Sequence, residues 1–265
     1  MITAFWSPTS GQSGTTSNML AIAIMSSVLL QKRILIMHNH YSDYSLEKAL
    51  IGKNTSQSLF EGIGIDSMLR NSKIPDLSES TIVNSVISLF NDRIHVLPGT
   101  TKEYKEQFEA EMKRSAPAIL DSVNHCYDLV FVDLTSGYGV LSETFLKMAD
   151  FIVVNLSQNL NSIDYYFSKY HFPQEKTIYL FGKYEKSSRY NLKNLERTYR
   201  CIRKKSAVIP YNVQFMDYVQ DGKLIQFVLK NLAGSKNEEN QYFIKKLGEA
   251  AELLTGFLMK AGDIS

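Results

Sequence analysis

The sequence predicts an α/β fold with a doubly wound, mostly parallel, seven-stranded sheet flanked by helices. Short aliphatic or β-branched runs alternate with longer helical patterns along the chain. Several of these runs, such as LVFVD and FIVVN, are continuously apolar, which is typical of strands covered on both faces. The expected strands are Ile2–Trp6, Ile34–Met37, Ile94–Leu97, Leu129–Asp133, Phe151–Leu156, Thr177–Phe181 and Ala207–Ile209.

Helical patterns lie between these runs. The clearest cover Thr16–Gln31, Thr101–Asn124 and Arg189–Arg203, and their alternation with strands indicates a doubly wound sheet. A last helical stripe predicts a helix that closes the core, with an amphipathic tail lying on a membrane as the alternative. That stripe consists of Phe243, Leu247, Ala251, Leu254 and Leu258.

Composition limits the protein class. With 265 residues, 44% of them hydrophobic, the chain is expected to form a single domain over residues 1–265 with a substantial core. The net charge of +2 does not indicate a nucleic-acid binder. Two cysteines are too few for a disulfide framework, and no secretory signal is apparent, so we expect a cytoplasmic protein. The longest mostly apolar stretch, Met19–Leu30, is too short to cross a bilayer.

The first strand leads into SPTSGQSGTTSN, a loop of small residues that opens a helix. Such a loop exposes backbone N–H groups and the positive end of the helix, which suits a phosphate. The P-loop pattern G-x-x-x-x-G-K-[ST] is matched by Gly14 and Thr16, whereas Thr9 replaces the first glycine and Thr15 the lysine. A tight strand–helix turn without a ligand is the alternative.

Asp133 ends the apolar run YDLVFVD. A hydrophobic strand that ends in Asp beside such a loop is the usual Mg²⁺-side partner of a P-loop Ser or Thr. The sequence therefore predicts a metal site formed by Thr16 and Asp133, unless Asp133 simply caps the next turn.

Taken in order, these segments resemble the ParA/MinD family of deviant P-loop ATPases. The loop SGQSGTTS resembles the family's K-G-G-x-G-K-T-T, and YDLVFVDLTSG resembles YDxhhhDxxxG. LPGT, ADFIVVNLSQN and AVIPYNVQFMDYVQDGKLI follow at the matching places. The likeness runs from about residue 2 to 230, and it is greatest to the TadZ/CpaE type, which helps place Flp-type pilus machinery at the cell pole.

The resemblance implies a set of site residues and partners. ATP with Mg²⁺ would be the ligand, two protomers would form a homodimer, and pilus assembly or polar localisation proteins would be partners. Peripheral attachment at the inner membrane or cell pole would follow. The base would lie near Lys183, Pro210 and Tyr211, beside Gly182. The phosphates would be held by Gly11, Gln12, Ser13, Gly14, Thr15, Thr16 and Ser17.

Departures from the family pattern indicate a degenerate Walker A loop. Ser10 stands at the signature lysine, Thr15 at the P-loop lysine, and His38-Asn39-His40 at the family's D-x-D. Phosphoryl transfer depends on positioning and on neutralising charge, so we expect at most a slow ATPase. A pseudo-ATPase scaffold that binds protein partners without nucleotide is the main alternative. His38 and His40, two apart on an extended segment, could instead join Asp133 in holding a divalent metal, contact a phosphate, or be hydrogen-bonded at a sheet edge.

The segment 183–205 is strongly basic, with nine Lys and Arg against Glu185 and Glu196, a local charge of +7. Arg189, Lys193, Arg197 and Arg200 recur at helical spacing and are expected to share one face. Such a face could bind nonspecific DNA in a ParA-like partition factor, an anionic membrane surface or an acidic protein, or it could simply be solvated.

Overall fold

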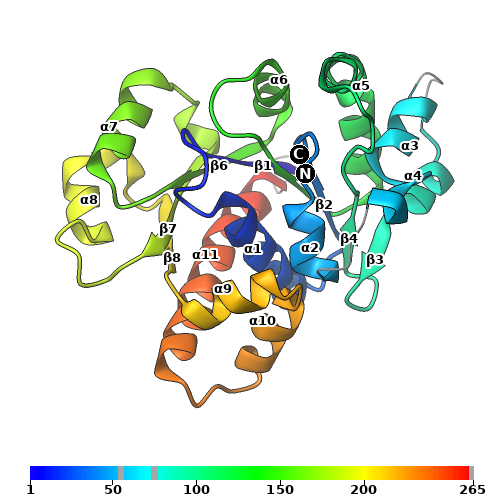
Figure 1. Ribbon diagram of the computed structural model, residues 1–265. Coiled ribbons are helices and arrows are strands. Elements are labelled where there is room, and N and C mark those ends of the chain that lie inside the picture. Colours follow the sequence, from blue (N-terminus) through cyan, green and yellow to red (C-terminus); the bar gives the residue numbers. More distant parts are fainter. Residues whose placement is uncertain (53–56, 73–76, 263–265) are drawn as a thin grey trace.

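The computed structural model describes residues 1–52, 57–72 and 77–262, and its centre is a sheet of eight strands (Figure 1). The strand order is β3-β4-β2-β5-β1-β6-β7-β8, and every neighbouring pair is parallel except β3–β4. The α/β class and the mostly parallel sheet are thus confirmed. The strands are β1 Ile2–Trp6, β2 Ile34–His38, β3 Ile87–Leu89, β4 Ile94–Val96, β5 Leu129–Asp133, β6 Phe151–Leu156, β7 Thr177–Tyr184 and β8 Ser206–Pro210.

The strand that the sequence did not predict is β3. It has only three residues, it is partly exposed, and it pairs antiparallel with β4 at the edge of the sheet. The turn between the two strands contains three consecutive residues with positive φ, Phe90, Asn91 and Asp92. An edge strand of this length has no continuous apolar run, so the pattern that identified the other seven is missing here.

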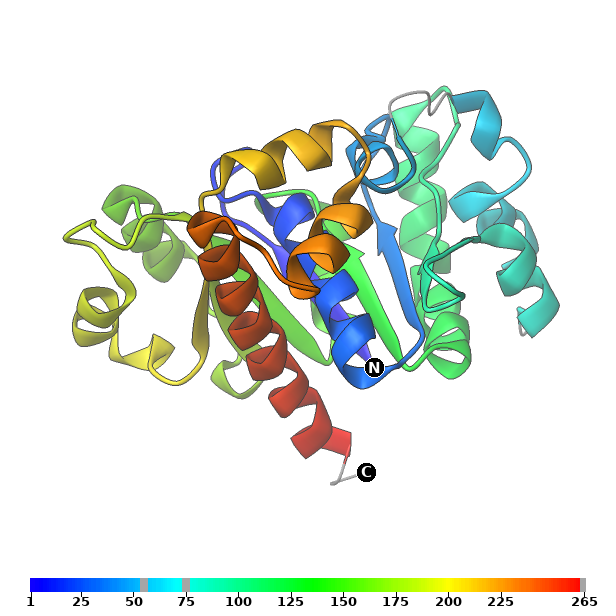
Figure 2. The same cartoon turned by 90° about the horizontal axis from the view of Figure 1, so that it is seen from below.

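Helices cover both faces of the sheet. Because successive strand residues point to opposite faces, each strand contributes side chains to both cores. In β1, Phe5 belongs to the core under α1, whereas Ala4 and Trp6 belong to the opposite core. Figure 2 shows α1, α9, α10 and α11 gathered on one face. That face carries α1 Thr15–Leu30, α2 Ser45–Ile51, α9 Val213–Gln220, α10 Leu224–Leu232 and α11 Glu238–Gly262. The other carries α3 Gly64–Asn71, α4 Glu79–Ser85, α5 Lys105–Cys126, α6 Val140–Met148, α7 Leu160–Lys169 and α8 Leu192–Thr198. Short 3₁₀ turns lie at η1 Gln57–Phe60, η2 Gln174–Lys176 and η3 Arg200–Ile202.

The last helix closes the core. Its stripe residues Phe243, Leu247, Ala251, Leu254 and Leu258 are at most 3% exposed and pack with α1 and the sheet. The apolar face proposed for a membrane-lying tail is therefore used inside the protein. Within the described part of the chain, none of the helices combines the length and the hydropathy needed to span a bilayer.

The prediction of a single helix over Arg189–Arg203 is wrong. The Asn191 side chain accepts from the Asn194 amide, so α8 begins only at Leu192, and it ends at Thr198 before the non-helical Tyr199. Arg200 lies in the separate turn η3. The four basic residues expected on one face consequently do not share a helix.

Candidate functional site

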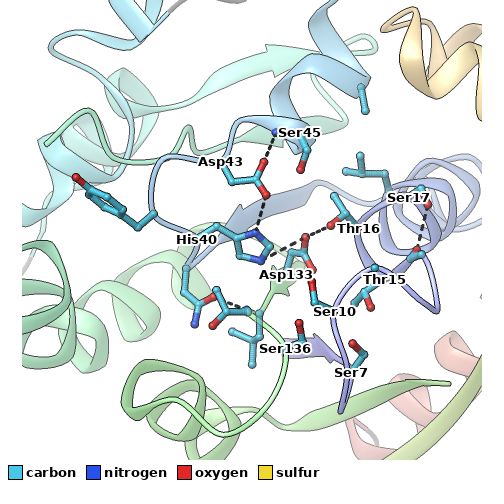
Figure 3. A pocket seen from close by; sticks show the side chains of 18 of the residues that line it. Ser7, Ser10, Thr15, Thr16, Ser17, His40, Asp43, Ser45, Asp133 and Ser136 are labelled. Carbon is cyan, nitrogen blue, oxygen red and sulfur yellow. Dashed lines mark hydrogen bonds and ion pairs between the residues drawn. The ribbon is translucent and has the colours of Figure 1, made fainter. Parts of the chain in front are cut away.

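A pocket of about 1140 Å³ opens at the carboxyl ends of β1, β2 and β5 (Figure 3). Segments distant in the sequence meet here, as expected for a parallel sheet, whose ligands bind beyond the carboxyl ends of the strands. The β1–α1 loop lies on one side and the segments after β2 and β5 lie opposite, with α2, α5 and α9 completing the wall. The lining includes Ser7, Ser10, Gly11, Gly14, Thr15, Thr16, Ser17, Asn39, His40, Asp43, Lys48, Lys105, Glu109, Asp133, Ser136, Met216 and Gln220.

The β1–α1 loop has the backbone geometry of an anion-binding turn. Gly11 and Gly14 have φ of 72° and 69°, a left-handed conformation that glycine adopts without strain. Gly14 is the N-cap of α1, so no side chain occupies the first N–H groups of the helix, and the first turn contains no acidic residue. The free N–H groups and the helix dipole therefore favour an anion at this point.

Thr16 and Asp133 come together as the sequence predicted. Thr16 Oγ1 donates to Asp133 Oδ2 at 2.5 Å, joining the first turn of α1 to the end of β5. Asp133 is only 1% exposed, and burial raises the pKa of its carboxyl, although the charge of His40 and the Thr16 hydrogen bond oppose this. Its second oxygen, Oδ1, is buried without a hydrogen-bond partner. A hydroxyl beside a carboxylate with a free oxygen is a donor set suited to Mg²⁺.

His40 lies between two carboxylates (Figure 3). Its Nδ1 is 3.5 Å from Asp43 Oδ2 and its Nε2 is 3.8 Å from Asp133 Oδ2. Burial lowers the pKa of His40, but the Asp43 hydrogen bond and the charge of Asp133 outweigh burial and raise it. His40 is therefore a candidate for positive charge in the pocket.

His38 contacts α2 through Glu47. Its Nε2 lies 3.0 Å from Glu47 Oε1, which also accepts from the Gly99 amide at 2.8 Å. The His38 and His40 rings are nearly perpendicular, with centroids 5.3 Å apart. In the described ranges 1–52, 57–72 and 77–262, no group of three or more His, Cys, Asp or Glu side chains could hold a metal ion. The alternative of a metal held by His38, His40 and Asp133 is therefore wrong.

The candidate base-binding residues lie at the ends of β7 and β8. Lys183 Nζ donates to the Gly11 carbonyl at 3.0 Å, so this residue reaches the loop. The Tyr211 amide donates to the Tyr184 carbonyl, and Tyr211 is 58% exposed. Pro210 pairs with Tyr184. Lys183, Pro210 and Tyr211 do not line the 1140 Å³ pocket, and neither do Gln12 and Ser13 of the loop.

Several lining residues were missed by sequence reasoning. Lys48 from α2 and Lys105 from α5 line the wall, and Lys105 Nζ lies 3.7 Å from Glu109 Oε1. Asn39 accepts from the Thr135 amide at 2.7 Å, joining the segments after β2 and β5. Lys48 and Lys105 belong to no local pattern, and only the fold brings them to the loop.

A glycine loop between a buried strand and a helix, with an acidic residue at the end of a neighbouring strand, is the arrangement typical of the P-loop fold. No protein-family profile matches the chain, and no curated protein is similar to it by sequence. Solved structures are similar in fold, at 14–15% identity.

Three such structures are proteins of the ParA/MinD type. A ParA family ATPase from Chlorobium tepidum has a TM-score of 0.71 at 15% identity, over 94% of this chain and 98% of its own. The cell division ATPase MinD of Pyrococcus furiosus has a TM-score of 0.68 at 14% identity, covering 96% and 98%. The septum site-determining protein MinD of Pyrococcus horikoshii, complexed with Mg-ADP, has a TM-score of 0.64 at 14% identity, covering 96% and 97%. The chain thus has a ParA/MinD-like fold.

Proposed function

We propose that this protein is a nucleotide-binding localisation or assembly factor with one P-loop NTPase-like domain. The observation that carries the proposal is the contact between Thr16 and Asp133 beside a glycine loop that opens a helix. In a P-loop protein, this pair holds the Mg²⁺ that bridges the nucleotide phosphates. A similar fold, that of Pyrococcus horikoshii MinD, is complexed with Mg-ADP.

The residues at the site fit ATP and Mg²⁺. The left-handed glycines and the uncapped start of α1 provide N–H groups for the phosphates, and the unpartnered Asp133 Oδ1 provides an oxygen for the metal. We assign phosphate binding to residues 11–17 and the metal to Thr16 and Asp133. Bound Mg²⁺ would supply positive charge against the phosphates. The base would lie toward Pro210 and Tyr211, where the resemblance implies it.

Hydrolysis is expected to be slow or absent. Ser10 and Thr15 stand where the ParA/MinD family has its two lysines, and His38-Asn39-His40 stands in place of its D-x-D. Loss of one group that stabilises the developing charge commonly costs about 3–4 kcal/mol in the transition state, or a factor of 10²–10³ in rate. Phosphate binding depends less on these groups, because backbone N–H groups and the helix dipole remain.

We infer that the nucleotide acts as a switch of oligomeric state. In this proposal two protomers face each other across the nucleotides, and the dimer recruits pilus assembly or polar localisation proteins of the TadZ/CpaE setting. In this role the protein would be cytoplasmic and attached peripherally at the inner membrane or cell pole. The fold likeness to ParA and MinD ATPases and the motif order in residues 2–230 support this proposal.

A scaffold that binds partners without nucleotide is the second candidate, and the absence of both loop lysines from the sequence favours it. Calorimetric titration with ATP–Mg²⁺, with Thr16→Ala beside the wild type, separates the two. Saturable binding that is lost in Thr16→Ala supports the nucleotide switch, because Thr16 holds Asp133 and faces the metal position. No heat and no thermal shift up to millimolar ATP would refute nucleotide binding and leave the scaffold.

The third candidate, a DNA-binding partition factor, rests on the basic segment 183–205. Its cations are spread over β7, the loop before α8, α8 itself, η3 and the turn before β8 rather than on one helix. A DNA gel shift at low salt tests this candidate, with the wild type compared to a variant in which Arg197, Arg200 and Arg203 are replaced. A shift that is lost in the variant supports the partition factor, and unchanged mobility of DNA with the wild type refutes it.

A further inference from the structure

A lysine from a distant part of the chain contacts the glycine loop. Lys183 is the second-last residue of β7. Its Nζ donates to the Gly11 carbonyl at 3.0 Å, although the two residues are 172 positions apart in the sequence. The side chain is exposed, so the contact is not a by-product of burial in the core. It places an ammonium group one residue from Ser10, on a loop that contains no lysine of its own.

The backbone around Lys183 is bent in a way that directs this side chain. Lys183 has φ of 50°, a left-handed conformation that residues with a Cβ seldom adopt. The pairing of β7 with β8 shifts register between Phe181 and Tyr184, so the irregularity spans Lys183. Such bulges commonly redirect a side chain next to a functional site, and a strained residue is a reason to look for a function.

The preceding residue brings β7 against the loop. A Cβ added at Gly182 would lie 1.9 Å from the Ser13 carbonyl oxygen and 2.4 Å from Asn18 Nδ2. Asn18 Nδ2 itself donates to the Ser13 carbonyl at 2.9 Å. Strand and loop are therefore in direct backbone contact, and Lys183 starts from a fixed point beside the loop.

We propose that Lys183 supplies the positive charge that the loop sequence lacks and binds the phosphates of a nucleoside polyphosphate. An ammonium group has three N–H donors, and the Gly11 carbonyl uses one of them. Two donors remain for phosphate oxygens, which bind a cation more strongly than a neutral carbonyl does. This inference rests on the proposed binding of nucleotide by residues 11–17, and it assigns Lys183 to the phosphates rather than to the base.

The test compares ligands that differ in phosphate and base content. Dissociation constants for ATP–Mg²⁺, inorganic tripolyphosphate and adenosine are measured by calorimetry for the wild type and Lys183→Met. We expect ATP and tripolyphosphate to bind about tenfold more weakly, or worse, because a hydrogen bond to a charged group is lost. Adenosine affinity should be unchanged, and Lys183→Arg should restore most of the polyphosphate affinity.

Two further variants separate a charge effect from a structural one. Lys204 also has positive φ, 64°, but lies in the turn between η3 and β8, so Lys204→Met is the matched control and should bind as the wild type does. Lys183→Gly removes the charge and also the backbone strain. It should bind tripolyphosphate as weakly as Lys183→Met, with a thermal midpoint that is unchanged or raised.

Each contrary result has a distinct meaning. Unchanged tripolyphosphate affinity in Lys183→Met overturns the assignment while the proposed nucleotide function stands. An equal loss for adenosine and ATP also overturns it, because Lys183 would then contact the base. A wild type that binds neither ATP nor tripolyphosphate refutes the proposed function itself, and the assignment with it.

Discussion

Replacing Asp133 with Asn should stabilise the protein without ligand and remove its response to ATP–Mg²⁺. The carboxyl is 1% exposed, Thr16 donates to one oxygen, and the other oxygen has no partner. Asn has nearly the same shape and still offers an acceptor to Thr16, but it carries no charge. The Asn amide nitrogen would take the unpartnered position, but a buried atom without a partner costs more when it is charged than when it is neutral, so we expect a gain of about 1 kcal/mol in the free energy of unfolding.

The same substitution should remove ligand-induced stabilisation. With ligand at about 100 times its dissociation constant, the wild type gains about 2.7 kcal/mol, or about 5–10 °C in the thermal midpoint for a chain of this size. The variant lacks the anionic oxygen for Mg²⁺ and should gain little. Thermal denaturation with and without ATP–Mg²⁺ measures both effects, and Asp121→Asn, which neutralises an exposed carboxylate outside the pocket, is the control.

The pH dependence provides an internal check. Because burial raises the pKa of Asp133 in the folded state, that state holds the proton more tightly than the unfolded chain does. The contribution of this group to stability is therefore highest below the unfolded pKa and falls as pH rises toward the folded one. Asp133→Asn should lack this fall. A variant that is less stable than the wild type at neutral pH, or that keeps the full ATP–Mg²⁺ shift, would refute the reasoning.

Three further predictions concern the fold. Gly182→Ala should lower the free energy of unfolding by about 1–3 kcal/mol in urea denaturation, because its Cβ would overlap the Ser13 carbonyl. Its control is Gly256→Ala, in open space on α11, which should be neutral or stabilising by up to about 1 kcal/mol. Burial raises the pKa of Tyr127 to about 12, so stability should fall as pH rises from about 10 toward 12, and the fall should be shallower in Tyr127→Phe; equal slopes for the two proteins would contradict this. Phe243→Ala should cost about 3–5 kcal/mol, because this fully buried ring packs between α11 and the sheet, and a loss below about 1 kcal/mol would show that the helix does not close the core.

The sheet could be predicted from sequence because its central strands are buried on both faces. LVFVD and FIVVN carry no polar interruption before their last residues, and both lie where expected. The edge strand β3 could not be predicted, since ISL is too short and too exposed to differ from a loop. The helix over 189–203 was overpredicted because the spacing of basic residues does not reveal that Asn191 caps a later start.

The candidate site likewise has a part that could be predicted from local sequence patterns and a part that depends on packing. Thr16 and Asp133 each belong to a local pattern, so their meeting could be expected once the strands were known to be parallel. The engagement of His38 with Glu47 could not, because it depends on how α2 packs after the end of β2. The contact of Lys183 with Gly11 is least visible of all, since it joins residues 172 positions apart through a bulge in β7.

The three-residue strand β3 also bears on how the protein can associate with itself. A long, flat edge strand presents a row of free N–H and C=O groups that another chain can extend, which leads to uncontrolled fibre-like growth. Here the β3 edge offers only three residues and is followed by a sharp left-handed turn. This border of the sheet is therefore a poor template for the addition of a strand from a second copy.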